Sequence, residues 1–246
     1  MFNKYSILLF SLLLSIENHV FARAGGGFGG GGGGFRGGFS SGGYHYYGRG
    51  GSGKFSWIHL IIIVSIIVIV GVAIFYSIVL YKNKKKKIAA KIINESNLTD
   101  QLWNKTNLED HVKKVYLLLQ DAWQKQDLML INQYITQHFF AINDRILENQ
   151  REENIINFIK VHKIESVEII GAQDFKDNDY DRFSVLIKVY LYEYYTFNGV
   201  VNENTRKDGT IEEILHFARL QNKWLLDGIQ ADVSVNGISL VRNYKE

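Results

Sequence analysis

The chain of 246 residues contains no cysteine. Disulfide bonds, thiolate catalysis and cysteine-ligated zinc are therefore excluded. Its seven histidines are scattered, and none of them forms an H-E-x-x-H motif or another close pair at metal-ligand spacing. We accordingly expect neither a metal nor another cofactor.

Acidic residues are almost absent from the first 99 positions, which hold 11 Lys and Arg but only Glu17 and Glu95 as acids. Residues 100–246 reverse this balance, with 17 Lys and Arg against 23 Asp and Glu. A nucleic-acid surface needs clustered basic side chains on the folded part of a protein. The acidic C-terminal part therefore argues against nucleic acid as a partner.

Residues 1–24 have the pattern of a signal peptide. Lys4 supplies the positive end, YSILLFSLLLSI is a short apolar core, and Ala22-Arg23-Ala24 is a small-x-small cleavage site. The core is too short to span a bilayer. A cleaved signal is our prediction, and an uncleaved membrane anchor is the alternative.

Residues 25–54 are rich in glycine, with 17 of the 23 glycines of the chain mixed with Phe, Tyr and Arg. Such a tract cannot bury enough surface to offset the backbone entropy lost on folding. It is predicted to be disordered. In a sharper alternative, its aromatic and arginine side chains make transient contacts with partners or with other copies of the tract.

The next segment is apolar over 24 positions, IHLIIIVSIIVIVGVAIFYSIVLY, apart from one histidine and isolated Ser and Tyr residues. A helix of this length crosses about 30 Å of hydrocarbon. Trp57 precedes the segment, and Tyr76 and Tyr81 stand near its end, where interfacial aromatic residues occur. The pattern predicts one transmembrane helix over residues 57–81.

Five lysines follow this segment directly, namely Lys82, Lys84, Lys85, Lys86 and Lys87. Positive charge beside a span is retained on the cytoplasmic side, and a cleaved signal predicts the same orientation. We therefore expect a single-pass protein of a bacterial inner (plasma) membrane, with the glycine-rich segment outside and the C-terminal domain in the cytoplasm. The lysines lie in a basic juxtamembrane linker, residues 82–105, and are interpreted as a topology signal that also attracts anionic lipid headgroups.

Residues 106–232 change their hydrophobic period from helical to strand-like. Apolar residues recur at three- and four-residue steps from Leu108 to Trp123, and two shorter helical patterns follow at residues 139–146 and 155–159. A period of two then predicts strands at 166–175, 182–197, 210–220 and 224–230. Helices followed by an antiparallel meander predict an α+β domain, with a C-terminal tail at 233–246.

Two stretches of this domain carry a family resemblance. LLLQDAWQKQDLMLINQYIT followed by HFF resembles the opening of the Tim44-like domain, and EEILHFARLQNKWLLDGIQ is similar to its ending. The resemblance implies N-terminal helices packed on a curved, cone-shaped antiparallel sheet of the nuclear-transport-factor-two-like kind. It also implies an apolar pocket, contact with anionic lipid and protein partners, and no catalysis. The chain has a membrane span in place of the long charged N-terminal region of the mitochondrial import protein, so an import-motor role is not implied.

The predicted pocket between helices and sheet has seven candidate lining residues. Trp123, Phe139 and Trp224 lie on apolar stripes, and the dense run of tyrosines exceeds what a core requires. Glu193 is in register with the apolar face of the strand that contains it. The full set is Trp123, Phe139, Tyr190, Tyr192, Glu193, Tyr195 and Trp224.

The leading hypothesis is a noncatalytic domain that binds anionic lipid, a membrane protein partner or both, in protein transport or membrane assembly. The alternative is a small-molecule enzyme or ligand-binding protein of the cone fold that uses a pocket carboxylate, with Glu193 as acid or base. Glu213, His216 and Asp227 also lie on predicted strands, where most polar residues face solvent. A third hypothesis assigns a structural or secretion role to the glycine-rich segment.

Overall fold

The computed structural model describes residues 57–246. The predicted signal peptide, residues 1–24, and the glycine-rich segment, residues 25–54, lie outside the described residues. The chain divides into two compact units, with the boundary in the described part directly after Lys84. We describe residues 57–84 and residues 85–246 separately.

Helix α2 (Trp57–Ser96) contains the predicted membrane span. It is long and apolar enough to cross a membrane, and none of its most apolar window is buried in protein. The expected linker at 82–105 is largely helical, because residues 82–96 continue α2 without a break. Lys, Ala and Ile fill most of these positions and no Gly or Pro interrupts them, so nothing in the sequence ends the helix before Ser96.

The last turns of α2 belong to the C-terminal unit. Ala89, Ile92, Ile93 and Ser96 are buried, and their spacing places them on one side of the helix. The three apolar residues join the main hydrophobic core of the domain. The folded domain therefore begins about twenty residues before the boundary predicted at residue 106.

Four helical segments lie between α2 and the sheet, and each begins at a polar cap. The Asn104 side chain accepts a hydrogen bond from the Asn107 amide, and Thr136 Oγ1 accepts one from the Phe139 amide. The predicted stripe from Leu108 to Trp123 is buried. The segments are the 3₁₀ helix η1 (Gln101–Trp103), α3 (Lys105–Gln124), the 3₁₀ helix η2 (Leu128–Tyr134) and α4 (Gln137–Glu152).

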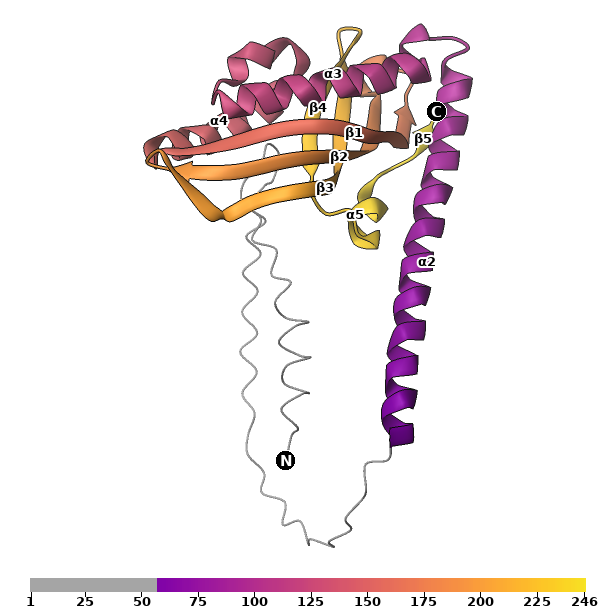
Figure 1. The fold of residues 1–246 in the computed structure, drawn as a ribbon. Helices are drawn as coiled ribbons and strands as arrows, with labels where there is room; N and C mark the ends of the chain where they lie inside the picture. The colour runs from indigo at the N-terminus through magenta and orange to yellow at the C-terminus, as the bar shows by residue number, and fades with distance from the viewer. Residues whose placement is uncertain (1–56) are drawn as a thin grey trace, which may run out of the picture. The chain divides into compact units, whose positions relative to one another are not determined.

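The sheet has five strands in the order β4-β3-β2-β1-β5. Strands β1 to β4 form an antiparallel meander, and β5 pairs in parallel with the end of β1. Three register shifts along β1 add the local bending that bulges cause, and the sheet curls around the helices α3 and α4 on one face (Figure 1). The strands are β1 (Ile155–Asp174), β2 (Arg182–Phe197), β3 (Val200–Leu220), β4 (Lys223–Gln230) and β5 (Tyr244–Lys245).

The architecture confirms the predicted α+β class, and it corrects one local prediction. Residues 155–159 are the start of β1 and not a short helix. Ile155 pairs with Phe197 at the far end of β2, and this pairing decides the conformation of a stretch rich in β-branched isoleucine. Strand β3 likewise begins at Val200, ten residues earlier than the predicted strand, because it pairs with the whole of β2.

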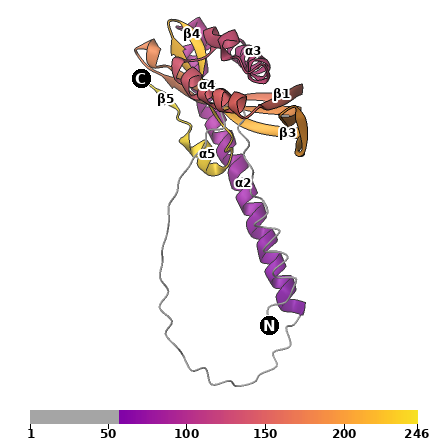
Figure 2. The ribbon, with the colours of Figure 1, turned by 90° about the vertical axis from the view of Figure 1, so that its left-hand side faces the viewer.

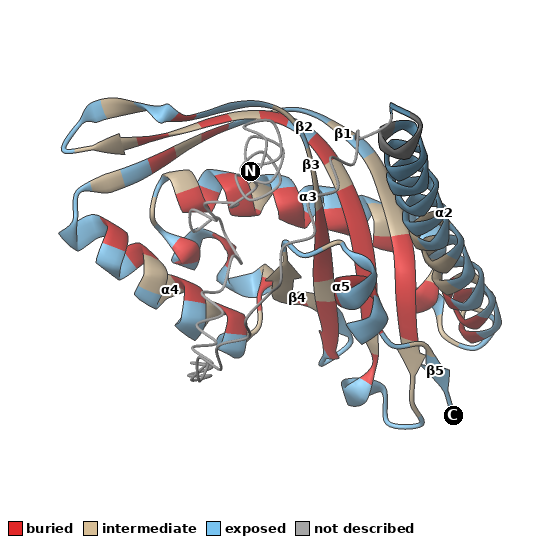
Figure 3. Cartoon of the chain, turned by 90° about the horizontal axis from the view of Figure 1, so that it is seen from below, coloured by how far each residue is buried: buried red, intermediate tan, exposed pale blue. Residues whose placement is uncertain are grey.

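The inner face of the sheet holds the main core. Phe183, Val185, Ile187, Val189 and Leu191 are all buried against the helices, as their alternation predicted. Figure 3 shows the resulting stripes of buried residues along β2 and β3.

The opposite face is partly covered by the C-terminal tail. Helix α5 (Val235–Leu240) lies on this side of the sheet (Figures 1 and 2), and Ile238 and Val241 are buried. Gly171 leaves room for the tail, because a Cβ atom there would lie 2.4 Å from Val241 Cγ1. Residues 233–246 are thus packed against the domain.

Candidate binding groove

A groove of about 320 Å³ opens among η1, α3, η2 and the turn between β3 and β4. This volume is at the lower end of the range for ligand pockets. Leu102, Leu108, Tyr134 and Trp224 contribute apolar and aromatic surface, and no carboxylate is among the lining residues. The full lining is Gln101, Leu102, Asn107, Leu108, His111, Gln133, Tyr134, Asn222, Lys223 and Trp224.

Trp224 is held at the base of the groove by two hydrogen bonds. Its Nε1–H donates to the Leu102 carbonyl at 3.0 Å, and its own carbonyl accepts from His111 Nε2 at 2.8 Å. Its ring packs edge-on against Phe183 and Trp103, with centroids 4.8 and 4.9 Å apart. The strand β4 is thereby tied to η1 and α3, so the base of the groove has a fixed shape.

His111 lies in the wall of the groove. Burial lowers its pKa from 6.5, and the positive charge of Lys114 acts in the same direction, while the bond to the Trp224 carbonyl opposes both. Because a carbonyl oxygen only accepts, the bonded Nε2 carries the proton, and Nδ1 is left as the acceptor nitrogen of the ring.

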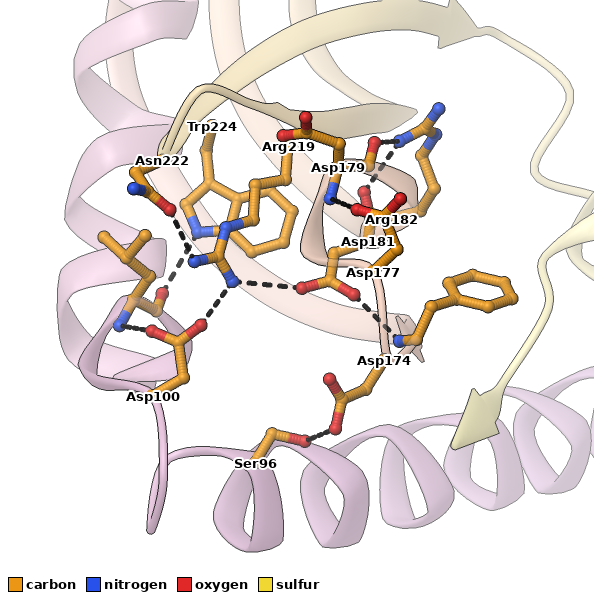
Figure 4. Close-up of polar contacts among 12 residues, drawn as sticks. Ser96, Asp100, Asp174, Asp177, Asp179, Asp181, Arg182, Arg219, Asn222 and Trp224 are labelled. Carbon is orange, nitrogen blue, oxygen red and sulfur yellow. Dashed lines mark hydrogen bonds and ion pairs between the residues drawn. The ribbon is translucent and has the colours of Figure 1, made fainter. Parts of the chain in front are cut away.

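Behind the groove, a buried ion-pair network joins three segments that are far apart in the sequence (Figure 4). Arg219, 3% exposed, donates to Asp100 and, at 3.1 Å, to Asp181 Oδ2. Asp100 also accepts from the Leu102 amide and so caps η1. The network therefore fixes η1, the end of β3 and the segment before β2 relative to one another.

Asp181 is the buried acid of this network. Burial raises the pKa of its carboxyl group, and hydrogen bonds from the Phe175 amide and from Arg219 act in the opposite direction. Removal of one partner of such a pair leaves a charge without compensation in the interior and typically costs about 3–5 kcal/mol. We therefore assign Arg219 and Asp181 a positioning role behind the groove.

The turn between β3 and β4 has two residues. Gln221 and Asn222 have φ values of 49° and 61°, the left-handed region that the central residues of such hairpin turns occupy and that asparagine tolerates well. Arg219 Nη2 donates to Asn222 Oδ1 at 2.9 Å, and the Gln221 amide donates to Asp179 Oδ1 at 3.2 Å. These bonds hold the turn so that Asn222 and Lys223 form one edge of the groove.

The seven residues predicted to line a pocket do not come together in one place. Trp224 alone among them lines the groove described above. Trp123 and Phe139 are buried in the core between helices and sheet. Glu193 and Tyr195 are buried on the inner face of β2, and Tyr190 and Tyr192 occupy the alternate positions of that strand, with Tyr190 37% exposed.

The candidate acid and base groups do not form one cluster, although His216 and Asp227 are close enough to interact electrostatically. Glu193 is 1% exposed, with Lys207 Nζ 3.9 Å from its Oε1, and it is not among the residues that line the groove. Glu213 accepts from the Tyr116 hydroxyl at 3.3 Å on the inner face. The remaining two are His216, 2.9 Å from the Ser184 hydroxyl, and Asp227, which accepts from Thr136 Oγ1 at 2.6 Å.

His216 is partly buried and has a lowered pKa, mainly because burial disfavours its charged form. A hydrogen bond with Gln230 and the negative charge of Asp227 act in the opposite direction. Within residues 57–246, no three His, Asp or Glu side chains are grouped closely enough to hold a metal ion.

The five lysines after the apolar segment differ in their surroundings. Lys85 donates to the Val241 carbonyl, and Lys86 pairs with Glu168 at 2.8 Å, so both contribute to contacts within the domain. Lys84 and Lys87 are exposed. The charge at positions 84 and 87 is therefore accessible to solvent or to headgroups.

Sequence reasoning missed His111, Arg219, Asp181 and Asp100 as parts of one site. These residues are spread over 120 positions, and only Arg219 lies in a stretch that carries the family resemblance. One local signal was available for Asp100. It directly precedes Gln101-Leu102-Trp103, and an aspartate before a helical segment is a typical N-cap. The pairing of Arg219 with two distant aspartates had no signal in a single sequence.

Comparison with known proteins supports the family resemblance. The sequence profile of the Tim44-like domain matches residues 89–231, which is more than half of the chain. The chain belongs to the Tim44-like domain family. The Tim44-like domain thus includes the last turns of α2, in agreement with the buried Ala89, Ile92 and Ile93.

No curated protein matches the chain in sequence. Among solved structures, the intermembrane space region of the chloroplast protein ARC6 is similar, with a TM-score of 0.41 and 9% sequence identity. The similarity covers 52% of this chain and 98% of the ARC6 region.

Proposed function

We propose that this protein is a single-pass membrane protein whose Tim44-like domain is a noncatalytic binding module at the cytoplasmic surface of the inner (plasma) membrane. The module binds a membrane protein partner and contacts anionic lipid. The proposal rests mainly on the direct continuation of the apolar helix into the domain, since α2 runs from Trp57 to Ser96 and its last turns are part of the core. Such tethering raises the local concentration of the domain beside membrane partners.

The noncatalytic assignment is supported by the positions of the candidate acid and base groups, none of which lines the groove. Glu193 and Glu213 lie in the interior, His216 bonds to Ser184, and Asp227 bonds to Thr136. General acid–base catalysis needs such groups within hydrogen-bond reach of one substrate. Under the alternative, an enzyme based on Glu193, the Glu193→Gln variant would lose the cellular function while its fold and its partner crosslinks were retained.

The orientation can be tested by cysteine labelling, because the chain has no cysteine of its own. Ser41→Cys places a thiol before the span, and Lys176→Cys places one in the domain at a side chain that is 83% exposed. In intact cells a membrane-impermeant maleimide should label the first variant and label the second only after lysis. Labelling of Lys176→Cys in intact cells would overturn the proposed orientation.

Lipid contact can be tested on the full chain in bilayer nanodiscs of mixed neutral and anionic lipid. Anionic lipid should co-purify with the protein, and the double variant Lys84→Gln/Lys87→Gln should lose part of it, since each lysine contributes about 1 kcal/mol near an anionic surface. Lys91→Gln is a matched control, because Lys91 is an exposed lysine of the same helix. Equal lipid content in all three proteins would reject the lysine contribution.

The partner can be tested by photo-crosslinking in cells at exposed positions of the domain. The expected result is a crosslink to a specific membrane protein, which persists in the lysine variants because the groove and its surroundings are unchanged. Absence of such a crosslink from every exposed face, with the protein correctly inserted, would remove the support for a binding module.

A further inference from the structure

The groove described above has a charge that is opposite to that of its domain. Residues 100–246 contain more acidic than basic side chains, yet the groove has Lys223 and no carboxylate among its lining residues. Lys114 is not a lining residue, but its Nζ lies 4.9 Å from the centroid of the Tyr134 ring, so a second positive charge lies beside this wall. The groove is therefore a basic site on an acidic domain.

Acids close by in the sequence are engaged elsewhere. Asp100, next to Gln101, is paired with Arg219. Glu109 and Asp110 of α3 are paired with Lys105 and Lys113, at 3.6 and 2.9 Å. These pairs leave the positive charge at Lys223 and Lys114 without a compensating carboxylate in the lining, which favours an acidic occupant.

The rim of the groove is made of amides. Gln101, Asn107, Gln133 and Asn222 are all exposed and line the opening. An amide side chain has both donors and an acceptor, and a peptide main chain presents one donor and one acceptor at each residue other than proline. An acyl chain has neither, so this rim matches a peptide better than it matches a lipid tail.

The groove is also preorganised. The Trp224 base is fixed by Leu102 and His111, and the left-handed turn that contains Asn222 is held by Arg219. A wall that is already ordered loses little conformational entropy when a ligand binds.

We propose that this groove binds a short peptide segment of a partner protein, with an apolar side chain over Trp224 and Tyr134 and acidic residues beside Lys223 and Lys114. The proposal deepens the binding function proposed above and rests on it. It specifies the chemistry of the partner as an acidic segment with at least one large apolar residue.

The test uses the full chain in nanodiscs of neutral phosphatidylcholine and a random nine-residue peptide display library as the probe. Selection should enrich peptides that combine Asp or Glu with Leu, Phe or Trp. Lys223→Glu should weaken the enriched peptides about tenfold and shift a fresh selection toward basic peptides, since like charges across an interface repel. Lys176→Glu, a charge reversal at an exposed turn outside the groove, should change neither result.

A second variant separates loss of the site from loss of the fold. Asn107→Trp alters an exposed side chain at the rim and should block the groove, while the thermal unfolding of the domain stays as in the parent. The proposal fails if enrichment has no acidic preference, or if Asn107→Trp and Lys223→Glu leave peptide binding unchanged. It also fails if no peptide is enriched while oleate, used as an amphiphile probe, binds to the parent protein and not to the Asn107→Trp variant.

The groove proposal and the proposed membrane function can fail separately. A protein that keeps its cellular crosslink after Asn107→Trp has a partner that binds elsewhere, and the groove proposal alone is rejected. A protein that selects acidic peptides in vitro but has no membrane partner in cells retains the groove proposal and loses the wider function.

Discussion

Helix α2 contains two regions with the same backbone conformation and opposite surroundings. In residues 61–77 apolar side chains point in all directions and are exposed, as with Ile69 at 66%. In residues 85–96 the apolar side chains gather on one side, and Ile93 is 1% exposed. The first pattern suits hydrocarbon and the second suits a protein core. The comparison shows that a domain boundary can lie inside a continuous helix and is marked by the distribution of side chains.

The largest difference between the two regions should appear on introduction of a charge. Ile93→Asp places a carboxylate in the core and should reduce the free energy of unfolding of the Tim44-like domain by about 3–5 kcal/mol. Ile69→Asp should leave the stability of the domain unchanged and weaken membrane insertion by about 3 kcal/mol. Denaturant titration of the domain and carbonate extraction of membranes measure the two effects. Equal loss of domain stability in both variants would contradict the division of α2.

Truncation can locate the start of the folded domain within α2. A chain that begins at Lys85 keeps the buried turns of α2, whereas one that begins at Thr99 loses Ala89, Ile92 and Ile93 from the core. The shorter chain should be less stable by about 3 kcal/mol, because each fully buried isoleucine contributes about 1.5–3 kcal/mol. Urea unfolding of the two chains checks this prediction. Equal midpoints would place the start of the domain after α2.

Acidification should reduce the stability of the folded domain, because the domain contains the partly buried histidines His111 and His216. The folded-state pKa of each lies below its ordinary value of 6.5, so the unfolded chain binds more protons. The stability from these groups is complete above about pH 6.5 and is lost as the pH falls from there toward the folded pKa. The thermal midpoint of the domain should decline over this interval.

The histidine contribution can be isolated by substitution. His111→Gln retains a donor for the Trp224 carbonyl and removes the titrating ring, so its thermal midpoint should depend less on pH than that of the parent. Asp181 works in the opposite sense, because a carboxyl with a raised pKa favours folding as the pH falls. Since Asp181 is present in both proteins, the difference between their pH profiles reports His111. Identical profiles would show that His111 does not titrate in this interval.

The smallest effect is expected at the polar contacts between α2 and the end of β1. Ser96 Oγ donates to Asp174 Oδ2 at 2.6 Å, and Lys245 pairs with Asp174 at 3.6 Å. Ser96→Ala should reduce domain stability by about 1 kcal/mol, the typical net contribution of one hydrogen bond. Ser77→Ala is the control, because Ser77 bonds only within the apolar region of α2, to the Ala73 carbonyl, and it should leave domain stability unchanged. If Ser96→Ala reduced domain stability as much as Ile93→Asp does, the polar contacts would contribute most of the free energy that holds α2 against the end of β1.

Hydrophobic periodicity predicted most of the fold because it is a local property. The spacing from Leu108 to Trp123 and the alternation from Phe183 to Leu191 each identify one buried face, and the structure has both. The prediction failed at Ile155, where a short isoleucine cluster is compatible with either period. There the partner strand decides the conformation, since Ile155 at the start of β1 pairs with Phe197 at the end of β2.

The candidate groove was much less accessible to prediction. The sequence identified Trp224 as aromatic and strand-borne, but it also grouped Trp224 with Glu193 and the tyrosines of β2, which the curled sheet places elsewhere. The face that a residue occupies follows from its register, whereas its position along and across the sheet follows from curvature and from loop packing.

The amino-acid sequence by itself determined the apolar helix, the order of helices and strands and the inward face of β2, because these depend on spacings of two to four residues and on the cost of exposing apolar surface. Tertiary structure decided where the domain begins within α2, how the tail covers the sheet, and which side chains surround the groove. Those features depend on contacts such as Arg219 with Asp100 and Asp181, whose members are brought together only when the curled sheet closes on its helices.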